Sequence, residues 1–211
     1  METEAAAPPT TRSTAERILD AAEDIFAQKG YAATSLGDVA DAVGIRSPSL
    51  YNHFKNKEAL YLAVLDRLLD DFTRPLQSLR EAPITRETLF EWLDTLVGLH
   101  HARPNLARLL QHAALSGGPH TNELIERLFR PMFESPDGAA LVADSGIGRL
   151  GEKGLQPWAV MALNNMVMSY VTMAPMYRDL LGQDPFGEQA LENQRTLIIT
   201  LLTAVLDYAG D

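Results

Sequence analysis

A glycine turn, followed by a short run of hydroxyl, amide and basic side chains, most constrains the fold of this chain. The stretch reads Gly44-Ile45-Arg46-Ser47-Pro48-Ser49-Leu50-Tyr51-Asn52-His53-Phe54-Lys55-Asn56-Lys57. Gly44 suits the left-handed residue just past a helix, and Ser47 before Pro48 is typical of a helix N-cap. Leu50 and Phe54 lie four apart and share an inward face, so the other side chains point outward. The whole stretch contains no acidic residue.

The preceding segment, residues 34–43, supplies a partner helix. Thr34 or Ser35 is its natural cap, and its apolar residues have the spacing of one helical face: Leu36, Val39, Ala40 and Val43. Two short helices joined through a glycine predict a helix-turn-helix unit, and the second helix suits a nucleic-acid major groove. The alternative is an ordinary αα-hairpin in a helical protein.

Three motifs carry a more specific resemblance. They are Thr34-Ser35-Leu36-Gly37-Asp38-Val39-Ala40, then Val43-Gly44-Ile45, then Ser49-Leu50-Tyr51-Asn52-His53-Phe54-Lys55-Asn56-Lys57-Glu58-Ala59-Leu60. Together they resemble the N-terminal domain of the tetracycline-repressor (TetR) family over roughly Ser13 to Leu65. The resemblance implies a homodimeric transcriptional regulator that binds a roughly palindromic double-stranded DNA operator. Members are usually repressors that a small ligand releases.

The resemblance also implies which side chains meet DNA. It assigns Thr34, Tyr51 and Lys57 to the DNA backbone. The side chains placed to meet bases or phosphates are Arg46, Ser47, Ser49, Asn52 and His53. Among these, Asn52 can pair with an adenine edge and Arg46 can reach a guanine.

Composition narrows the function classes. The formal net charge of −10 argues against nucleic-acid binding. The charges are unevenly distributed, however: Arg46, His53, Lys55 and Lys57 cluster, while most acids lie downstream. A basic tip on an acidic body predicts few phosphate contacts and a modest salt slope. The chain has no cysteine, no secretory signal and no apolar run of about 18 residues, which favours a cytoplasmic protein without a membrane span.

Catalytic and metal-binding patterns are missing from the sequence. We find no Gly-x-Ser-x-Gly elbow, no phosphate-binding glycine loop and no cysteine nucleophile, so we expect no enzyme activity and no cofactor. The histidines at positions 100, 101, 112 and 120 lack the paired spacing of metal ligands, so no metal site is expected.

The chain is expected to be all-α. We assign residues 1–12 to a disordered tail, 13–56 to the helix-turn-helix domain, 57–80 to a connecting helix, and 81–211 to a ligand-binding and dimerisation domain. A Ser13–Glu16 capping box starts the first helix, Gly30 closes it, Asn56 caps the connecting helix, and Pro75 bends or ends that helix. The expected later helices span residues 85–101, 104–115, 120–133, 139–142, 157–175 and 187–208.

An effector pocket is expected in the second domain. Five of the methionines lie between Met161 and Met176, and methionine suits pockets that accept varied apolar ligands. It also fills gaps in cores and interfaces, and both interpretations stay open. The candidate pocket residues are Trp92, His100, Phe129, Met132, Phe133, Met161, Asn165 and Met168.

The last two expected helices have the composition of a dimer surface. Two such helices from each subunit can form a four-helix bundle, although the same faces can instead complete the monomer core. The candidate interface residues are Trp158, Ala162, Met166, Ser169, Tyr170, Met173, Leu197, Leu201, Ala204, Val205 and Tyr208. The rival functions are a helical small-molecule-binding protein or enzyme without DNA function, and a DNA-binding activator or constitutive binder without ligand control.

Overall fold

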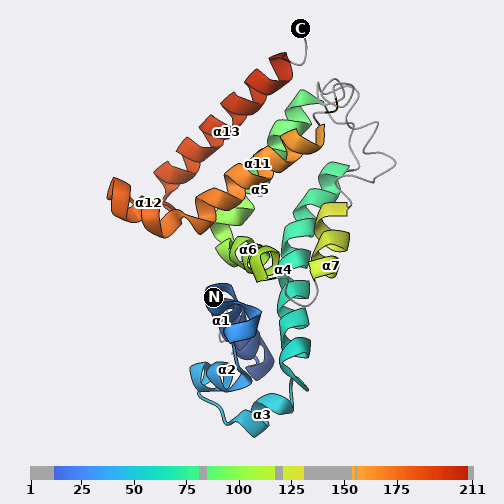
Figure 1. Ribbon diagram of the computed structural model, residues 1–211, viewed down its shortest axis with the longest axis vertical. Coiled ribbons are helices and arrows are strands. Elements are labelled where there is room, and N and C mark those ends of the chain that lie inside the picture. The colour runs from blue at the N-terminus through green and yellow to red at the C-terminus, as the bar shows by residue number, and fades with distance from the viewer. Residues whose placement is uncertain (1–11, 81–84, 117–120, 131–153, 155, 209–211) are drawn as a thin grey trace, which may run out of the picture. The chain divides into compact units, whose positions relative to one another are not determined.

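All elements that the computed structural model describes are helices, as expected from the sequence (Figure 1). The described residues are 12–80, 85–116, 121–130, 154 and 156–208. The helices are α1 (Thr14–Ala33), α2 (Leu36–Val43), α3 (Ser47–Tyr51), α4 (Lys57–Arg80), α5 (Arg86–Ala102), α6 (Pro104–Ser116), α7 (Thr121–Leu124), the π-helical segment η1 (Ile125–Phe129), α11 (Gln156–Thr172), α12 (Ala174–Leu181) and α13 (Glu188–Tyr208). The chain forms two compact units that divide between Leu65 and Asp66, within α4.

Helix α1 is the support of the first unit. Its N-terminus has the predicted capping box, in which Ser13 and Glu16 bond reciprocally. Ile18, Ala22 and Phe26 are fully buried on its inner face. Gly30 leaves the helical conformation with φ 76°, so the regular helix breaks where the sequence predicts its end. The last turn, through Ala33, follows this break and leads into α2.

Helix α2 and the turn after it also match the prediction. Ser35, one of the two predicted caps, accepts a hydrogen bond from the Asp38 backbone N–H. Gly44 has φ 73°, and its N–H and that of Ile45 bond back to carbonyls of α2, which closes the helix in a tight turn. Arg17 of α1 donates to the Val43 carbonyl at 2.7 Å and ties this end of α2 to α1.

The start and end of α3 differ from the prediction. Arg46 is the N-cap residue and makes no side-chain cap, so Ser47 is the first helical residue and not the cap. The helix has five residues and ends at Tyr51, whereas the sequence suggests Pro48 to Phe54. It ends early because the His53 N–H bonds to the Leu50 carbonyl three residues back, which tightens the chain into a turn.

Helix α4 begins as predicted, with the Asn56 side chain accepting a bond from the Ala59 N–H at 2.7 Å. Pro75 lies inside the helix and does not end it: α4 continues to Arg80. A proline removes one backbone donor, while the buried side chains of Leu68, Leu69 and Phe72 keep the preceding turns packed. Thus α4 contributes residues to both compact units.

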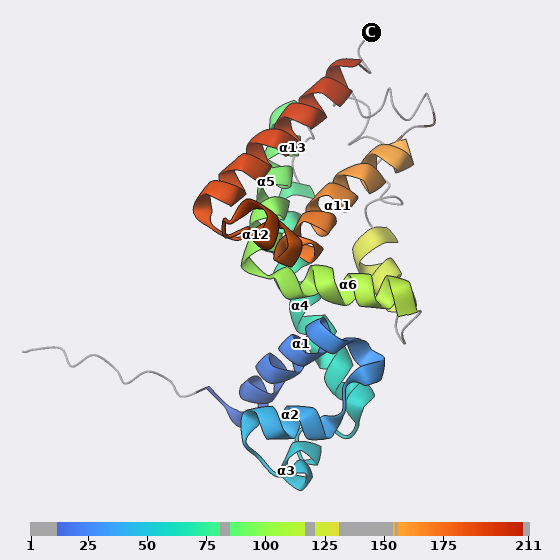
Figure 2. The ribbon, with the colours of Figure 1, turned by 60° about the vertical axis from the view of Figure 1, so that its left-hand side comes forward.

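The second unit is a bundle of packed helices. Helix α5 contacts α6, α11 and α13, and α6 also contacts α7 and α11. Figures 1 and 2 show α5 beside α11 and α13 from two directions. The buried side chains of this unit are mostly aliphatic, and include Leu93, Leu96, Leu106, Leu109, Val167, Val171, Ile198 and Leu202.

Helix α12 was not expected from the sequence, which suggests one helix from Pro157 to about Pro175. The structure ends α11 at Thr172 because Met173 leaves the α-helical conformation, with φ −91° and ψ 0°. Pro175 then lies in the first turn of α12, where its missing N–H costs nothing. The proline therefore starts a helix here. The expected helix at 139–142 and the candidates Met132 and Phe133 lie outside the described residues, as do the side chains of Phe129 and Tyr208.

Candidate nucleic-acid interface

The outer face of α3 and its flanks gathers six of the predicted DNA contacts. Leu50 is fully buried and fixes the underside of the helix. Tyr51 is 54% exposed although it is aromatic. The other exposed members of this group are Arg46, Ser47, Ser49, Asn52 and His53. We call these six residues the α3 face.

The α3 face has an unneutralised positive character. Arg46 of the α3 face and the exposed Lys55 that follows the face form no ion pair with any residue that the structure describes. No acid lies between Gly44 and Lys57. The nearest carboxylate upstream of this turn is Asp41 on α2, and Glu58 is the first acid downstream. The hydroxyl, amide and cationic groups of the face are the types that meet phosphates and base edges.

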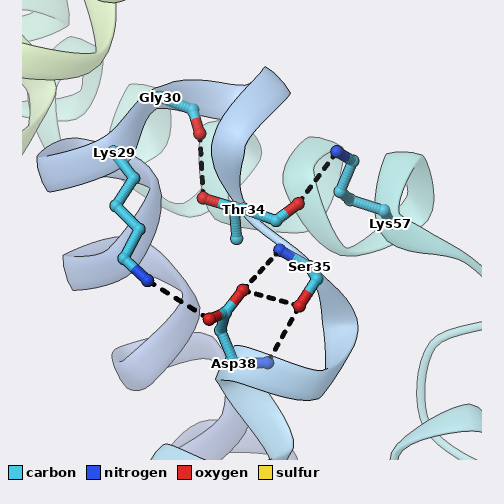
Figure 3. Close-up of polar contacts among 6 residues, drawn as sticks. All are labelled: Lys29, Gly30, Thr34, Ser35, Asp38 and Lys57. Atoms are coloured by element: carbon cyan, nitrogen blue, oxygen red, sulfur yellow. Dashed lines mark hydrogen bonds and ion pairs between the residues drawn. The ribbon is translucent and has the colours of Figure 1, made fainter.

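The junction between α1 and α2 is held by a cluster around Asp38 (Figure 3). Its carboxylate accepts hydrogen bonds from the Ser35 N–H at 2.8 Å and the Ser35 hydroxyl at 2.6 Å. Lys29 of α1 adds a charge-assisted bond at 3.2 Å. The Ser35 hydrogen bonds, with the smaller help of Lys29, lower the pKa of Asp38 from its ordinary value of 3.8 to about 2.

Thr34 and Lys57 lie together on the other side of this junction (Figure 3). Thr34 is only 2% exposed, and its hydroxyl donates to the Gly30 carbonyl at 2.8 Å. The Lys57 ammonium donates to the Tyr31 and Thr34 carbonyls, both at 2.9 Å. It also lies 4.4 Å from the centroid of the Tyr31 ring. Both side chains therefore tie the end of α1 to the start of α4.

Sequence reasoning missed several of these supporting residues. Lys29, Asp38 and Arg17 make some of the polar contacts of the first unit, but none of the three was a candidate. The Ser35–Asp38 spacing of a capping box is a signal that could have found Asp38. Lys29 and Arg17 gave no such signal, because their partners come from another helix. Tyr31 and Tyr61 also pack edge to face at 4.9 Å behind the Lys57 site.

The candidate pocket residues of the second unit do not lie on one surface. His100 is buried, whereas Trp92 and Met168 are half-buried. Met161 and Asn165 of α11 are exposed, so neither lines an interior pocket among the described residues. Their spacing of four residues places them on the same face of α11, and this face is exposed at both positions.

Most of the exposed large apolar side chains of the second unit lie on α11, α12 and α13. Trp158 is 67% exposed and Leu197 is 57% exposed. The remaining exposed candidates of the dimer surface are Ala162, Ser169, Leu201, Ala204 and Val205. Met166, Met173 and Tyr170 are half-buried, and the Tyr170 hydroxyl donates to the Pro185 carbonyl at 2.8 Å within the same unit. Tyr170 therefore has a packing role inside the subunit.

No group of three or more His, Cys, Asp or Glu side chains among the described residues is arranged to hold a metal ion. No helix in the described part of the chain is long and apolar enough to cross a membrane.

Comparisons with known proteins agree on one kind of protein. Residues 18–64 match the family model described as "Bacterial regulatory proteins, tetR family". The chain is 28% identical over 190 residues to the HTH-type transcriptional regulator RutR of Escherichia coli (strain K12), covering 86% of this chain and 87% of RutR. It is 34% identical over 143 residues to the HTH-type transcriptional regulator Mb3439c of Mycobacterium bovis (strain ATCC BAA-935 / AF2122/97), covering 63% of this chain and 68% of that protein.

A third relative is more similar over a shorter stretch, and the fold has solved counterparts. Over 57 residues the chain is 54% identical to the HTH-type transcriptional repressor ComR of Escherichia coli (strain K12), which is 27% of each protein. A crystal structure of a TetR-like transcriptional regulator from Rhodococcus sp. RHA1 aligns with a TM-score of 0.58 and 19% identity, covering 93% of this chain and 96% of that one. At that identity the likeness concerns the fold alone.

Proposed function

The chain belongs to the tetR family of bacterial regulatory proteins, and on that premise we propose that it is a homodimeric repressor released from its operator by a small-molecule effector. It is a helix-turn-helix transcriptional regulator that binds DNA. We propose four further properties: a palindromic operator, a small-molecule effector, a homodimer and repression. We also propose a cytoplasmic location, where the DNA is accessible. The observation that carries it is the exposed, acid-free α3 face fixed from below by Leu50.

We propose that each α3 enters a major groove. Arg46, Ser47, Ser49, Asn52 and His53 then meet bases or phosphates, and Tyr51 meets the DNA backbone. For Thr34 and Lys57, the contacts at the α1–α4 junction support an indirect part, because the Thr34 hydroxyl and the Lys57 ammonium already bond to carbonyls. Any contact of Lys57 with a phosphate would come in addition to this anchoring.

The dimer would form through α11 and α13. Trp158 of α11 and Leu197 and Leu201 of α13 expose apolar surface, and water disfavours that exposure. The exposed Met161 and Asn165 extend the same side of α11 and join this surface in the proposal. Pairing two helices from each copy buries the stripe in a four-helix bundle and gives the two-fold symmetry that a palindromic operator requires.

Effector control would act through α4. Arg127 of η1 forms ion pairs with Asp66 and with Asp70, the latter at 3.6 Å. Arg103, which follows α5, pairs with Asp71 at 2.5 Å. Residues 66–71 of α4 are thus held by ion pairs to the elements that would surround an effector. The first turns of the same helix belong to the DNA-binding unit. An effector that changes these ion pairs could shift α4 and, through its first turns, α3.

Footprinting on the DNA upstream of the gene tests the proposal. The expected pattern is two protected half-sites whose centres lie about one helical turn, or a multiple of it, apart. Asn52→Ala should abolish the pattern, while Gln111→Ala, an exposed amide on α6, should leave it intact. A single protected half-site would overturn the dimer, and uniform protection of all sequences would overturn operator recognition. Increased transcription on binding would identify an activator.

A further inference from the structure

The side chain of Arg17 reaches from α1 to the last residue of α2. Its guanidinium donates a hydrogen bond of 2.7 Å to the Val43 carbonyl. This is the one polar contact that the guanidinium makes with the part of the chain that the structure describes. Because Arg17 is otherwise exposed, water screens its charge and the bond adds only modestly to stability. The bond therefore matters through the geometry that it fixes.

The Val43 carbonyl belongs to the peptide at which the chain leaves α2. The N–H groups of Gly44 and Ile45 bond to carbonyls one turn back in α2, in the pattern of a Schellman motif. Those bonds lie within α2 and its turn. The bond from Arg17 instead comes from α1 and holds the peptide next to Gly44, where the backbone turns with φ 73°.

Helix α3 takes its orientation from α2 and this turn. Helix α2 packs against both α1 and α3, and it lies between them in Figure 2. Residues 44–46 alone separate α2 from α3. Of the five described residues of α3, Leu50 is the buried one. A single buried side chain fixes the depth of a helix but leaves it free to tilt, so the tilt of α3 depends on the turn.

A small tilt of α3 is enough to change its base contacts. Five residues of α-helix are about 8 Å long, so a tilt of about 10° moves the far end by about 1 Å. A recognition site has to be held to within about 0.5 Å to keep its hydrogen bonds. Contacts to phosphates tolerate more movement, because they carry no base-edge geometry. Loss of the tilt should therefore weaken sequence preference first.

We propose that Arg17 is a positioning residue for the α3 face: its bond to the Val43 carbonyl fixes the tilt of α3 and thereby its base contacts. This inference rests on the proposed function, because it assumes that the α3 face reads an operator. Arg17 itself touches no base in this proposal. It acts through the turn, from the end of α2 that leads into α3.

The other end of α2 offers an internal comparison. Lys29 of α1 bonds to Asp38 there at 3.2 Å, so it is also a cation of α1 tied to α2. That end is already held without Lys29, because Ser35 and Asp38 cap the helix reciprocally and two residues join it to α1. Losing Lys29 should therefore leave α3 in place.

An exposed guanidinium could instead bind a DNA phosphate directly, and this alternative predicts a different result. Loss of a phosphate contact weakens binding to every duplex alike and lowers the salt dependence of the affinity. Loss of the tilt weakens binding to the operator while binding to unrelated DNA persists. The ratio of the two affinities distinguishes the roles.

Fluorescence anisotropy with the native upstream duplex and a scrambled duplex measures this ratio. Arg17→Met should lower the preference for the native duplex about 5- to 10-fold, with the affinity for the scrambled duplex within about 2-fold of the wild type. Arg17→Lys should keep most of the preference, because the bond uses a single N–H. Lys29→Met removes one cation from the same helix and should keep it too. Equal weakening on both duplexes in Arg17→Met, or an equal loss of preference in Lys29→Met, would overturn the proposal.

A second measurement needs no DNA. Residual dipolar couplings of the backbone N–H groups report the orientation of α3 relative to α2 in the free protein. The couplings of residues 47–51 should depart from the wild-type orientation in Arg17→Met and match it in Arg17→Lys, while those of α1 match in both. An unchanged α3 in Arg17→Met would overturn the proposal. A wild type without preference for the native duplex would refute the proposed function, and the couplings would still decide the role of Arg17.

Discussion

At the scale of single residues, the α3 face and its support should respond differently to substitution. Tyr51 is exposed and lies on the face, so Tyr51→Ala should weaken operator binding about 3- to 10-fold while the melting temperature stays unchanged. Fluorescence anisotropy and a thermal melt measure the two quantities. Full operator affinity in Tyr51→Ala would remove Tyr51 from the interface, and a lowered melting temperature would show that the side chain supports the fold.

Lys57 should behave in the opposite way. Lys57→Met leaves the Tyr31 and Thr34 carbonyls without their cationic donor, so the first unit should lose about 1.5–3 kcal/mol of stability. Lys55→Met is the matched control, because Lys55 is exposed and has no partner among the described residues. Denaturant titration of both variants distinguishes them. Equal stability of the two would mean that the Lys57 contacts contribute nothing.

Asp38 gives the first unit a defined pH dependence. Its pKa is about 2 in the folded protein against an ordinary value of 3.8, so the folded state binds fewer protons. The stability that its charge contributes is therefore complete above about pH 4 and lost as the pH falls towards 2. We expect the difference in stability between the wild type and Asp38→Asn to vanish over that range. A difference that persists to pH 2 would contradict the role of the carboxylate.

At the scale of elements, the turn between α2 and α3 depends on Gly44. Its φ of 73° is left-handed, and an added Cβ would meet no atom within 4 Å. The cost of Gly44→Ala is therefore backbone strain alone, about 1–2 kcal/mol. Gly37→Ala is the control, since Gly37 lies within α2, where alanine is favoured. Chemical denaturation should show a lower free energy of unfolding for Gly44→Ala than for the wild type, and no loss for Gly37→Ala. Equal losses in the two variants would contradict this account.

The junction of α5 and α13 contains a polar pair, His101 and Gln194, whose burial lowers the stability of the fold. His101 and Gln194 bond to each other, but His101 Nδ1 and Gln194 Nε2 are buried without a partner among the described residues. Replacing both, as in His101→Phe with Gln194→Met, should be neutral or stabilising, whereas His101→Phe alone should destabilise by about 1–3 kcal/mol. A double variant that is less stable than the single one would contradict this reading of the pair.

How well the sequence predicts an element depends on where its determining contacts lie. The caps at Ser13, Ser35 and Asn56 and the turn at Gly44 depend on neighbours along the chain, and the structure has all four. The early end of α3 depends on the hydrogen bond from the His53 N–H to the Leu50 carbonyl, and the separate helix α12 depends on the backbone conformation of Met173. Neither feature has a residue pattern that marks it in the sequence. The same limit applies to the site: the exposed α3 face followed from helical spacing, but the anchoring of Lys57 crosses from α4 to α1.

At the scale of the whole molecule, the exposed side of α11 and α13 should hold the dimer. Leu201→Glu adds a charge to that surface without disturbing the subunit core, because Leu201 is exposed in the single chain. It should convert a dimer into a folded monomer by analytical ultracentrifugation. Leu115→Glu is the control, since Leu115 is equally an exposed leucine but lies on α6. Loss of the dimer in both variants, or in neither, would contradict the assignment of the interface.

The central claim is that the α3 face reads a DNA sequence. Fluorescence anisotropy tests it most directly, with labelled DNA from upstream of the gene, a scrambled duplex, and two salt concentrations. We predict clear preference for the native duplex in the wild type, a modest loss of affinity at the higher salt, and loss of the preference in Asn52→Ala. Equal and strongly salt-dependent binding to both duplexes, or a preference that survives in Asn52→Ala, would contradict the claim.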